Sequence, residues 1–293
     1  MVVLAATWKV HDDVASGTKL VNGGSGTINE STVKTPDRTI DTWKQNKPVK
    51  HWVEGSQEVD GKVALDNDVI SAQVTSDLPN PSDLAHKLSN VQVIDDYSQF
   101  KNHVKTSSIR VLENGVDVTS QYTIEDNAGT GIITATRKDP SSTPAGKVQM
   151  NVSFQINADT PSGTTFKNTP VSVINKSRVT GQKVTLTTYK PTTDKHWTEG
   201  TQVVDDKTYI ASDTINARIE MSLPDPSTLT KKLTKVQLVD DYTQLAKYVS
   251  DPSDIRVEEN GKDVTSEYSI ATANGHITAT RKDPSTTPAG TVA

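Results

Sequence analysis

The stretch VQVIDDY, residues 91–97, alternates in the way of a β-strand that turns one face to a core. Val91, Val93 and Asp95 share the apolar face, whereas Ile94 lies on the other. The last of these inward-facing positions is therefore occupied by an acidic residue, Asp95. A charge at an inward position is costly unless a partner neutralises it, so this stretch predicts a strand and a buried polar site together.

Similar strands recur on both sides of this stretch. Alternating runs occur at 131–139, 148–157 and 183–189, and Asn114-Gly115 separates two such runs, which is a strong hairpin signal. Residues 98–105 have room for one short helical excursion. The sequence therefore predicts an all-β fold of tandem immunoglobulin-like sandwiches with short helical insertions.

The chain repeats itself at long range. KHWVEGSQEV (50–59) returns as KHWTEGTQVV (195–204), and the stretch that contains VQVIDDY returns as KLTKVQLVDDYTQL (232–245). The first residues also belong to the pattern, because 8–29 aligns with 154–175.

This alignment predicts three regions. Residues 1–44 are the C-terminal third of a repeat unit, 45–190 form one complete unit, and 191–293 are the N-terminal two thirds of the next. The ends of the chain meet in register. Either a longer array has been cut at arbitrary points, or residues 1–44 of one molecule complete residues 191–293 of another.

Composition excludes several classes of function. The formal net charge is -5 with no basic patch, which argues against a nucleic-acid partner, and cysteine is absent, which excludes disulfides and thiolate metal sites. No apolar run approaches the length of a membrane span, and no signal peptide is visible. We find no catalytic set with turnover, no cofactor motif and no metal-ligand loop, and we expect His51 and His196 to be surface residues.

Three residue types stand where the pattern demands apolar ones. Lys50 shares parity with Trp52, Asp95 continues an inward face, and Asn168 follows Phe166 by two residues. A buried lysine can be a neutral nucleophile, and a buried aspartic acid can be protonated and polarise a carboxamide. The amine would attack the asparagine Cγ and ammonia would leave, which gives an isopeptide bond.

Each of these residues also has an ordinary interpretation when it is taken alone. An inward aspartate is often a hydrogen-bonded core acid, an asparagine beside a phenylalanine can cap a turn, and a lysine can extend past a tryptophan to solvent. Lys47 and Asn175 are rivals for the amine and the carboxamide. Asn175 lies an odd number of residues from Asn168, which predicts the opposite face of a continuous strand.

The unit resembles the C-terminal domains of streptococcal antigen I/II adhesins. The resemblance is carried by the strand-entry Lys50, by VIDDY at 93–97, by FKNT at 166–169 and by the V-x-N that follows. It is similar more broadly to isopeptide-forming domains of Gram-positive surface proteins. It implies a modified immunoglobulin-like (CnaA-like) sandwich and a spontaneous bond between Lys50 and Asn168, assisted by Asp95.

The incomplete unit contains the same amine and acid. Lys195 and Asp240 occupy the places of Lys50 and Asp95, and the matching asparagine in this chain is Asn22, which is followed by two glycines instead of Thr-Pro. A Lys195–Asn22 bond, assisted by Asp240, would join neighbouring molecules head to tail into fibres by strand complementation.

The sequence therefore predicts a structural stalk or adhesin repeat of an extracellular, cell-wall-anchored surface protein. Its partners would be copies of itself and no nucleic acid or membrane. The alternative is a module that binds a host glycoprotein or carbohydrate, for which exposed aromatic residues would be evidence. Trp8, Trp43, Trp52 and Trp197 are the candidates, although core packing suits most of them better.

Overall fold

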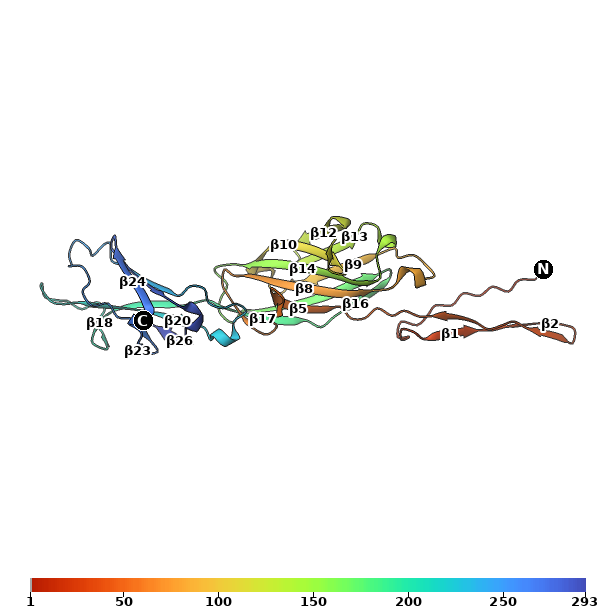
Figure 1. The fold of residues 1–293 in the computed structure, drawn as a ribbon, viewed down its shortest axis with the longest axis horizontal. Helices are drawn as coiled ribbons and strands as arrows, with labels where there is room; N and C mark the ends of the chain where they lie inside the picture. The colour runs from red at the N-terminus through yellow and green to blue at the C-terminus, as the bar shows by residue number, and fades with distance from the viewer. Residues whose placement is uncertain (1) are drawn as a thin grey trace.

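The computed structural model describes residues 2–293 as three regions arranged along one long axis (Figure 1). We call residues 2–44 the head segment, 45–190 the central unit and 191–293 the C-terminal unit. The head segment and the C-terminal unit lie at opposite ends, with the central unit between them. None of the helices in residues 2–293 has the length and apolar character needed to cross a membrane.

The central unit is a sandwich of two sheets. The first sheet has the order β11-β10-β14-β8-β5-β6, and the second has the order β12-β13-β9-β15-β17-β7, with β16 added to β15. All neighbours are antiparallel except β17 and β7. The strand bounds are β5 Val49–Glu54, β6 Gln57–Glu58, β7 Val63–Leu65, β8 Val69–Leu78, β9 Val91–Asp96, β10 Val104–Glu113, β11 Val116–Asp117, β12 Tyr122–Asn127, β13 Ile132–Arg137, β14 Gly146–Ile156, β15 Thr165–Ile174, β16 Ser177–Thr180 and β17 Val184–Tyr189.

The inward faces of both sheets form one core. Trp52, Phe100, Phe154 and Phe166 are almost fully buried in it, and the Phe100 and Phe166 rings stack with centroids 4.7 Å apart. The predicted hairpin is present between β10 and β11, and Asn114 and Gly115 both adopt the positive φ that a two-residue turn requires. The predicted all-β sandwich fold is thus confirmed.

Helical structure in residues 2–293 is limited to single turns. The excursion predicted within 98–105 is the 3₁₀ turn η2, and the Pro-rich loops form further turns of this kind. The turns are η1 Pro81–Asp83, η2 Lys101–His103, η3 Thr119–Gln121, η4 Pro140–Ser142, η5 Pro226–Thr228, η6 Thr265–Glu267 and η7 Pro284–Thr286.

The C-terminal unit repeats the first part of the central unit. One sheet has the order β19-β18-β20-β26-β22-β23, and a second, smaller sheet has the order β21-β25-β24. Within the described residues no strand pairs with the outer edge of β21, the edge that β15 occupies on β9 in the central unit. The bounds are β18 Thr193–Glu199, β19 Gln202–Val203, β20 Asn216–Leu223, β21 Gln237–Asp241, β22 Glu258–Glu259, β23 Lys262–Asp263, β24 Tyr268–Ala273, β25 His276–Arg281 and β26 Gly290–Val292.

The head segment consists of two consecutive two-stranded ladders that are largely exposed. Strand β1 (Lys19–Asn22) pairs with β4 (Arg38–Asp41), and β2 (Ser25–Ile28) pairs with β3 (Ser31–Lys34). Residues 8–14, which align with the end of β14 and the loop after it, form no strand. In the central unit β14 lies between β8 and β10, and the head segment contains neither counterpart.

The central and C-terminal units are joined by more than the linker. The Thr230 N–H donates to the Val63 carbonyl, and Val63 forms a parallel bridge with Leu229. The Lys231 ammonium donates to the Val69 carbonyl at 2.6 Å and lies 3.5 Å from the Glu54 carboxylate. The segment 229–231 of the C-terminal unit thus contacts both sheets of the central unit, at β7 in the second and at β5 and β8 in the first.

Candidate cross-linking site

Three strands bring the predicted residues of the central unit into one place. Lys50 lies on β5 of the first sheet, and it faces Asp95 on β9 and Asn168 on β15 of the second. Because Asp95 is paired with Pro170 across the β9–β15 ladder, Asn168 is the diagonal neighbour of Asp95 on the same face. Residues far apart in the sequence therefore share one site between the sheets.

The site is dry. The Lys50 and Asp95 side chains have 0% exposure, and Asn168 as a residue also has 0%. An aromatic residue stands two positions from each site residue in the sequence, and all three of these aromatic residues are buried in the core: Trp52, Tyr97 and Phe166. Strand alternation thus builds an apolar wall around three polar groups.

The amine and the acid are in contact. Lys50 Nζ lies 2.6 Å from Asp95 Oδ2, without the angles of a well-aligned hydrogen bond. The Asn168 amide lies close enough to Asp95 to lower the pKa of the Asp95 carboxyl. Within residues 2–293, however, neither polar atom of that amide has an aligned hydrogen-bond partner. Buried polar groups usually find partners, so this arrangement is unusual for a purely structural cluster.

Burial favours the neutral forms of both Lys50 and Asp95. Loss of hydration lowers the pKa of the Lys50 amine, and this outweighs the opposing attraction of Asp95. Loss of hydration likewise raises the pKa of the Asp95 carboxyl, against the charge of Lys50 and the Asn168 amide. A proton transferred from Lys50 to Asp95 would leave an uncharged amine beside a carboxylic acid.

The C-terminal unit brings together only two of its three predicted residues. Lys195 on β18 lies 2.5 Å from Asp240 on β21, but the two side chains are 40% and 17% exposed. Asn22 is exposed on β1 of the head segment, at the other end of the molecule (Figure 1). Within one chain the second predicted triad is therefore not assembled.

The rival residues lie elsewhere. Lys47 is exposed, and Asn175 has a positive φ at a turn, where its side-chain oxygen accepts hydrogen bonds from the backbone N–H groups of Ser89 and Asn90. Asn175 thus ties two loops together outside the site.

Sequence reasoning missed one supporting residue. Asp60 accepts a hydrogen bond from the Trp52 N–H at 2.7 Å and contacts His51 at 2.8 Å, which pins the strand that carries Lys50. Asp205 makes the same two contacts with Trp197 and His196. An aspartate stands eight residues after the tryptophan of each repeated K-H-W motif, and this repetition could have revealed the contact from the sequence. Residues 2–293 contain no cluster of three or more acidic, histidine or cysteine ligands that could hold a metal ion.

A second missed contact closes one end of the central core. The Gln45 side-chain amide donates to the Ser172 hydroxyl at 2.6 Å, and both residues are buried. Neither residue is repeated in the aligned units: Lys190 stands at the position of Gln45, and Gly26 at the position of Ser172. No repeated motif could have revealed it.

These features define a class of protein: an elongated, all-β module built from immunoglobulin-like sandwich units. The family model for the cell surface antigen I/II C2 terminal domain matches residues 44–187 and again residues 189–290. The chain belongs to this family, and therefore to the domains of Gram-positive surface adhesins. The resemblance predicted from the sequence is confirmed.

Solved structures show the same fold. The C-terminal domain of the Streptococcus pyogenes antigen I/II-family protein AspA aligns with a TM-score of 0.67 and 17% identity, over 84% of this chain and 89% of that one. The C-terminal domain of the Streptococcus agalactiae antigen I/II polypeptide BspA aligns with a TM-score of 0.64 and 16% identity, over 84% and 88%. No curated protein matches the chain in sequence.

Proposed function

We propose that the chain is a stalk repeat of a cell-wall-anchored adhesin. In its central unit, an isopeptide bond between Lys50 and Asn168 covalently joins the two sheets. The observation that carries this proposal is the buried contact of Lys50 with Asp95 beside the Asn168 carboxamide. The free energy of unfolding of an ordinary domain is about 5–15 kcal/mol. A covalent link between the two sheets would keep them joined even when the unit unfolds under force.

The reaction begins with a proton transfer. Lys50 Nζ gives a proton to Asp95, which creates the neutral amine that can attack and the acid that can donate. The directions of both pKa shifts favour this exchange. The protonated Asp95 then donates a hydrogen bond to the Asn168 side-chain oxygen, which makes Cγ more electrophilic.

The amine next attacks Asn168 Cγ. The new Nζ–Cγ bond forms, the Cγ–Nδ2 bond breaks, and a proton from Nζ passes through Asp95 to the departing nitrogen, which leaves as ammonia. Folding supplies the proximity, because the three groups come from two sheets and meet only when the sandwich closes. The reaction occurs once per unit and has no turnover.

Intact mass spectrometry tests this proposal. Each bond removes one ammonia, about 17 Da, from the mass that the sequence predicts. We expect the unmodified chain to show this loss and the Lys50→Ala, Asn168→Ala and Asp95→Ala variants to retain their full calculated masses. A full mass for the unmodified, folded chain would refute the bond.

The alternative function, direct binding of a host glycoprotein or carbohydrate, has less support. Trp8 and Trp43 are exposed, but both lie in the head segment, and Trp8 aligns with Phe154, which is buried in the central core. Trp52 is fully buried. Because the aligned position is a core position, the exposure of Trp8 is no evidence for a ligand surface.

A further inference from the structure

Strand β15 changes its partner beside Asn168. Along one edge it pairs with β16 from Val171 onward and with β17 up to Asn168, and residues 181–183 join these two partners. The three joining residues lie opposite only two residues of β15, 169–170, so they form a β-bulge, and we call residues 181–183 the bulge. Bulges re-aim neighbouring side chains and are frequent next to active sites. This bulge lies beside the carboxamide of the site.

The first residue of the bulge, Gly181, has no room for a side chain. Its φ lies outside the left-handed region, so its backbone conformation is open to other residues. A methyl group there would overlap the Pro48 carbonyl oxygen and lie 2.8 Å from Pro170 Cγ. The first obstacle is backbone and the second belongs to a rigid ring, so neither can rotate away. No other glycine in residues 2–293 outside the left-handed region would meet a backbone atom under 3.0 Å.

The segment 45–48, which we call the lead-in segment, precedes β5 and is fixed to both sheets. The side-chain amides of its first two residues donate to the Ser172 hydroxyl on β15 at 2.6 Å and to the Asp77 carboxylate on β8 at 2.9 Å. Its last residue, Pro48, is buried with its carbonyl group against Gly181. The path by which the chain enters β5 is therefore defined by three contacts, one of which needs a glycine.

The contact of the lead-in segment with the bulge is equally close to both reactive groups. Lys50 follows Pro48 by two residues, and Asn168 precedes Pro170 by two. Two residues of a strand span about 7 Å, so the contact lies one side-chain repeat from the amine and one from the carboxamide. Pro170 is also the cross-strand partner of Asp95. The close approach at the bulge therefore fixes the spacing of the backbones that carry all three site residues.

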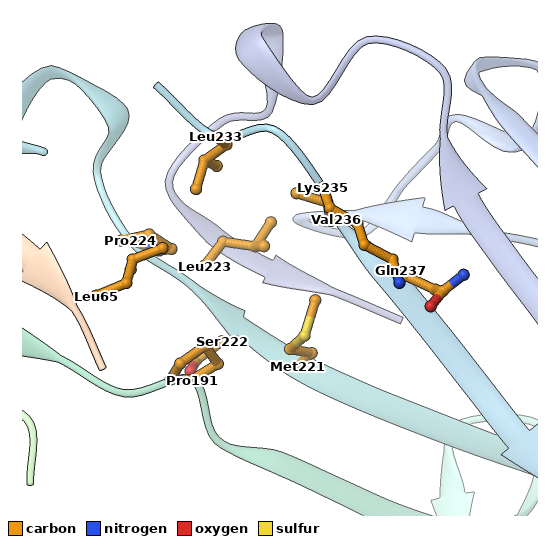
Figure 2. A pocket seen from close by; sticks show the side chains of 10 residues that line it. All are labelled: Leu65, Pro191, Met221, Ser222, Leu223, Pro224, Leu233, Lys235, Val236 and Gln237. Atoms are coloured by element: carbon orange, nitrogen blue, oxygen red, sulfur yellow. The ribbon is translucent and has the colours of Figure 1, made fainter. Parts of the chain in front are cut away.

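The C-terminal unit has a different lead-in. Its aligned segment, 190–193, is tied to β20 through the Thr192 N–H, which donates to the Ser222 hydroxyl at 2.9 Å. Figure 2 shows Pro191 of this segment on the wall of a cavity of about 270 Å³, together with Met221. The lead-in segments of the two units thus differ although the strands that follow them are alike. Substitutions at the bulge therefore test the central site alone.

We propose that Gly181 is a positioning residue for the cross-linking reaction, because its lack of a side chain lets the lead-in segment pack directly on the bulge and so brings Lys50 Nζ to Asn168 Cγ. This inference rests on the proposed function. A methyl group at Gly181 forces the lead-in segment and the bulge apart by about 1 Å. A misplacement of about 1 Å can slow a reaction between positioned groups by about 100-fold.

Refolding of the full chain separates folding from bond formation. The chain is isolated unfolded in urea from inclusion bodies, and its full calculated mass establishes that no bond has formed. After dilution of the urea, near-UV circular dichroism follows the packing of the core, and intact mass spectrometry follows the loss of ammonia. We expect Gly181→Ala to fold and then to lose ammonia about 100-fold more slowly than the unmodified chain.

Gly129→Ala is the matched control and should lose ammonia at the unmodified rate. Gly129 lies in the loop between β12 and β13, outside the left-handed region, and an added methyl group would meet only the Asn127 side-chain oxygen at 3.3 Å. Urea titration of Gly181→Ala in an Asn168→Ala background measures the packing cost alone, because no bond can form there. A merely structural role would lower that midpoint and leave the rate of ammonia loss in the folded chain unchanged.

Gln45→Ala is a milder variant that decides the matter if Gly181→Ala does not fold. It removes the hydrogen bond of the lead-in segment with Ser172, and we expect it to slow bond formation about fivefold, in line with the net strength of one hydrogen bond. Equal rates for folded Gly181→Ala and Gly129→Ala would overturn the proposal, as would an unmodified rate for Gln45→Ala beside an unfolded Gly181→Ala. A full mass for the folded, unmodified chain would instead refute the bond itself, and this inference with it.

Discussion

The central and C-terminal units contain the same lysine–aspartate contact in different surroundings. Lys50 lies 2.6 Å from Asp95, and Lys195 lies 2.5 Å from Asp240. The first pair has no solvent exposure, whereas the second is 40% and 17% exposed. The sequence around the two pairs is nearly the same, so residue identity does not explain the difference.

The closing strand explains it. In the central unit β15 pairs with β9 and covers the site with Asn168 and Phe166, and burial then shifts the pKa of Lys50 down and that of Asp95 up. In the C-terminal unit no strand of the described chain covers β21. Within the described chain Lys195 and Asp240 are thus a partly exposed ion pair.

The largest expected effect is the loss of the central bond. Asn168→Ala leaves the Lys50–Asp95 contact in place but removes the carbon that the amine would attack. A cross-link between Lys50 and Asn168 closes a loop of about 118 residues, and such a link stabilises by roughly 5 kcal/mol through the entropy of the unfolded chain. We expect the thermal midpoint of the central unit to fall by roughly 10–20 °C in calorimetry.

Lys47→Ala is the matched control, because Lys47 is an exposed lysine on the segment that leads into β5. Its midpoint should stay within about 2 °C of that of the unmodified chain. If Asn168→Ala and Lys47→Ala gave the same midpoint, the central unit would owe no stability to a bond at Asn168.

An intermediate effect concerns pH. Asp95→Ala leaves Lys50 buried without the carboxylate that raises its pKa, so burial lowers that pKa unopposed by Asp95. The folded state then holds fewer protons on Lys50 than the unfolded state, whose pKa is near 10.5. The free energy of unfolding should therefore increase as pH rises towards 10.5, by up to about 1.4 kcal/mol per pH unit.

Urea titrations at a series of pH values measure this slope. The double variant Lys50→Met, Asp95→Ala is the control, because it removes the titrating amine and should lose the slope. Equal slopes for the single and double variants would mean that Lys50 keeps its ordinary titration in the folded unit.

The smallest effect belongs to the open pair. Lys195→Ala removes a lysine that is 40% exposed. Exposed ion pairs contribute at most about 1 kcal/mol, so the unfolding free energy of the C-terminal unit should change by no more than that. A loss of several kcal/mol would show that the pair is already a strong interaction without a closing strand.

Much of the fold could be predicted from alternation. The inward positions of Val91, Val93 and Asp95, the hairpin at Asn114-Gly115 and the short turn at η2 all follow from local patterns. The repeat also located both lysine–aspartate pairs, because each motif is read twice in one chain.

Other features depend on partners that local patterns do not reveal. Ile94, on the outer face of its strand, is 6% exposed because it packs with Val171 and Val173 of the neighbouring strand. Residues 8–14 form no strand because the two neighbours of β14 are absent from the head segment. The contact of Gln45 with Ser172 joins residues of distant segments and has no counterpart in the repeat.

The most direct test of the central claim is a high-resolution crystal structure of the full chain. The account predicts continuous electron density from Lys50 Nζ to Asn168 Cγ at an amide bond length of about 1.33 Å, with no density for Asn168 Nδ2. Separate side chains, with Nζ and Cγ about 3 Å or more apart and an intact carboxamide, would contradict it.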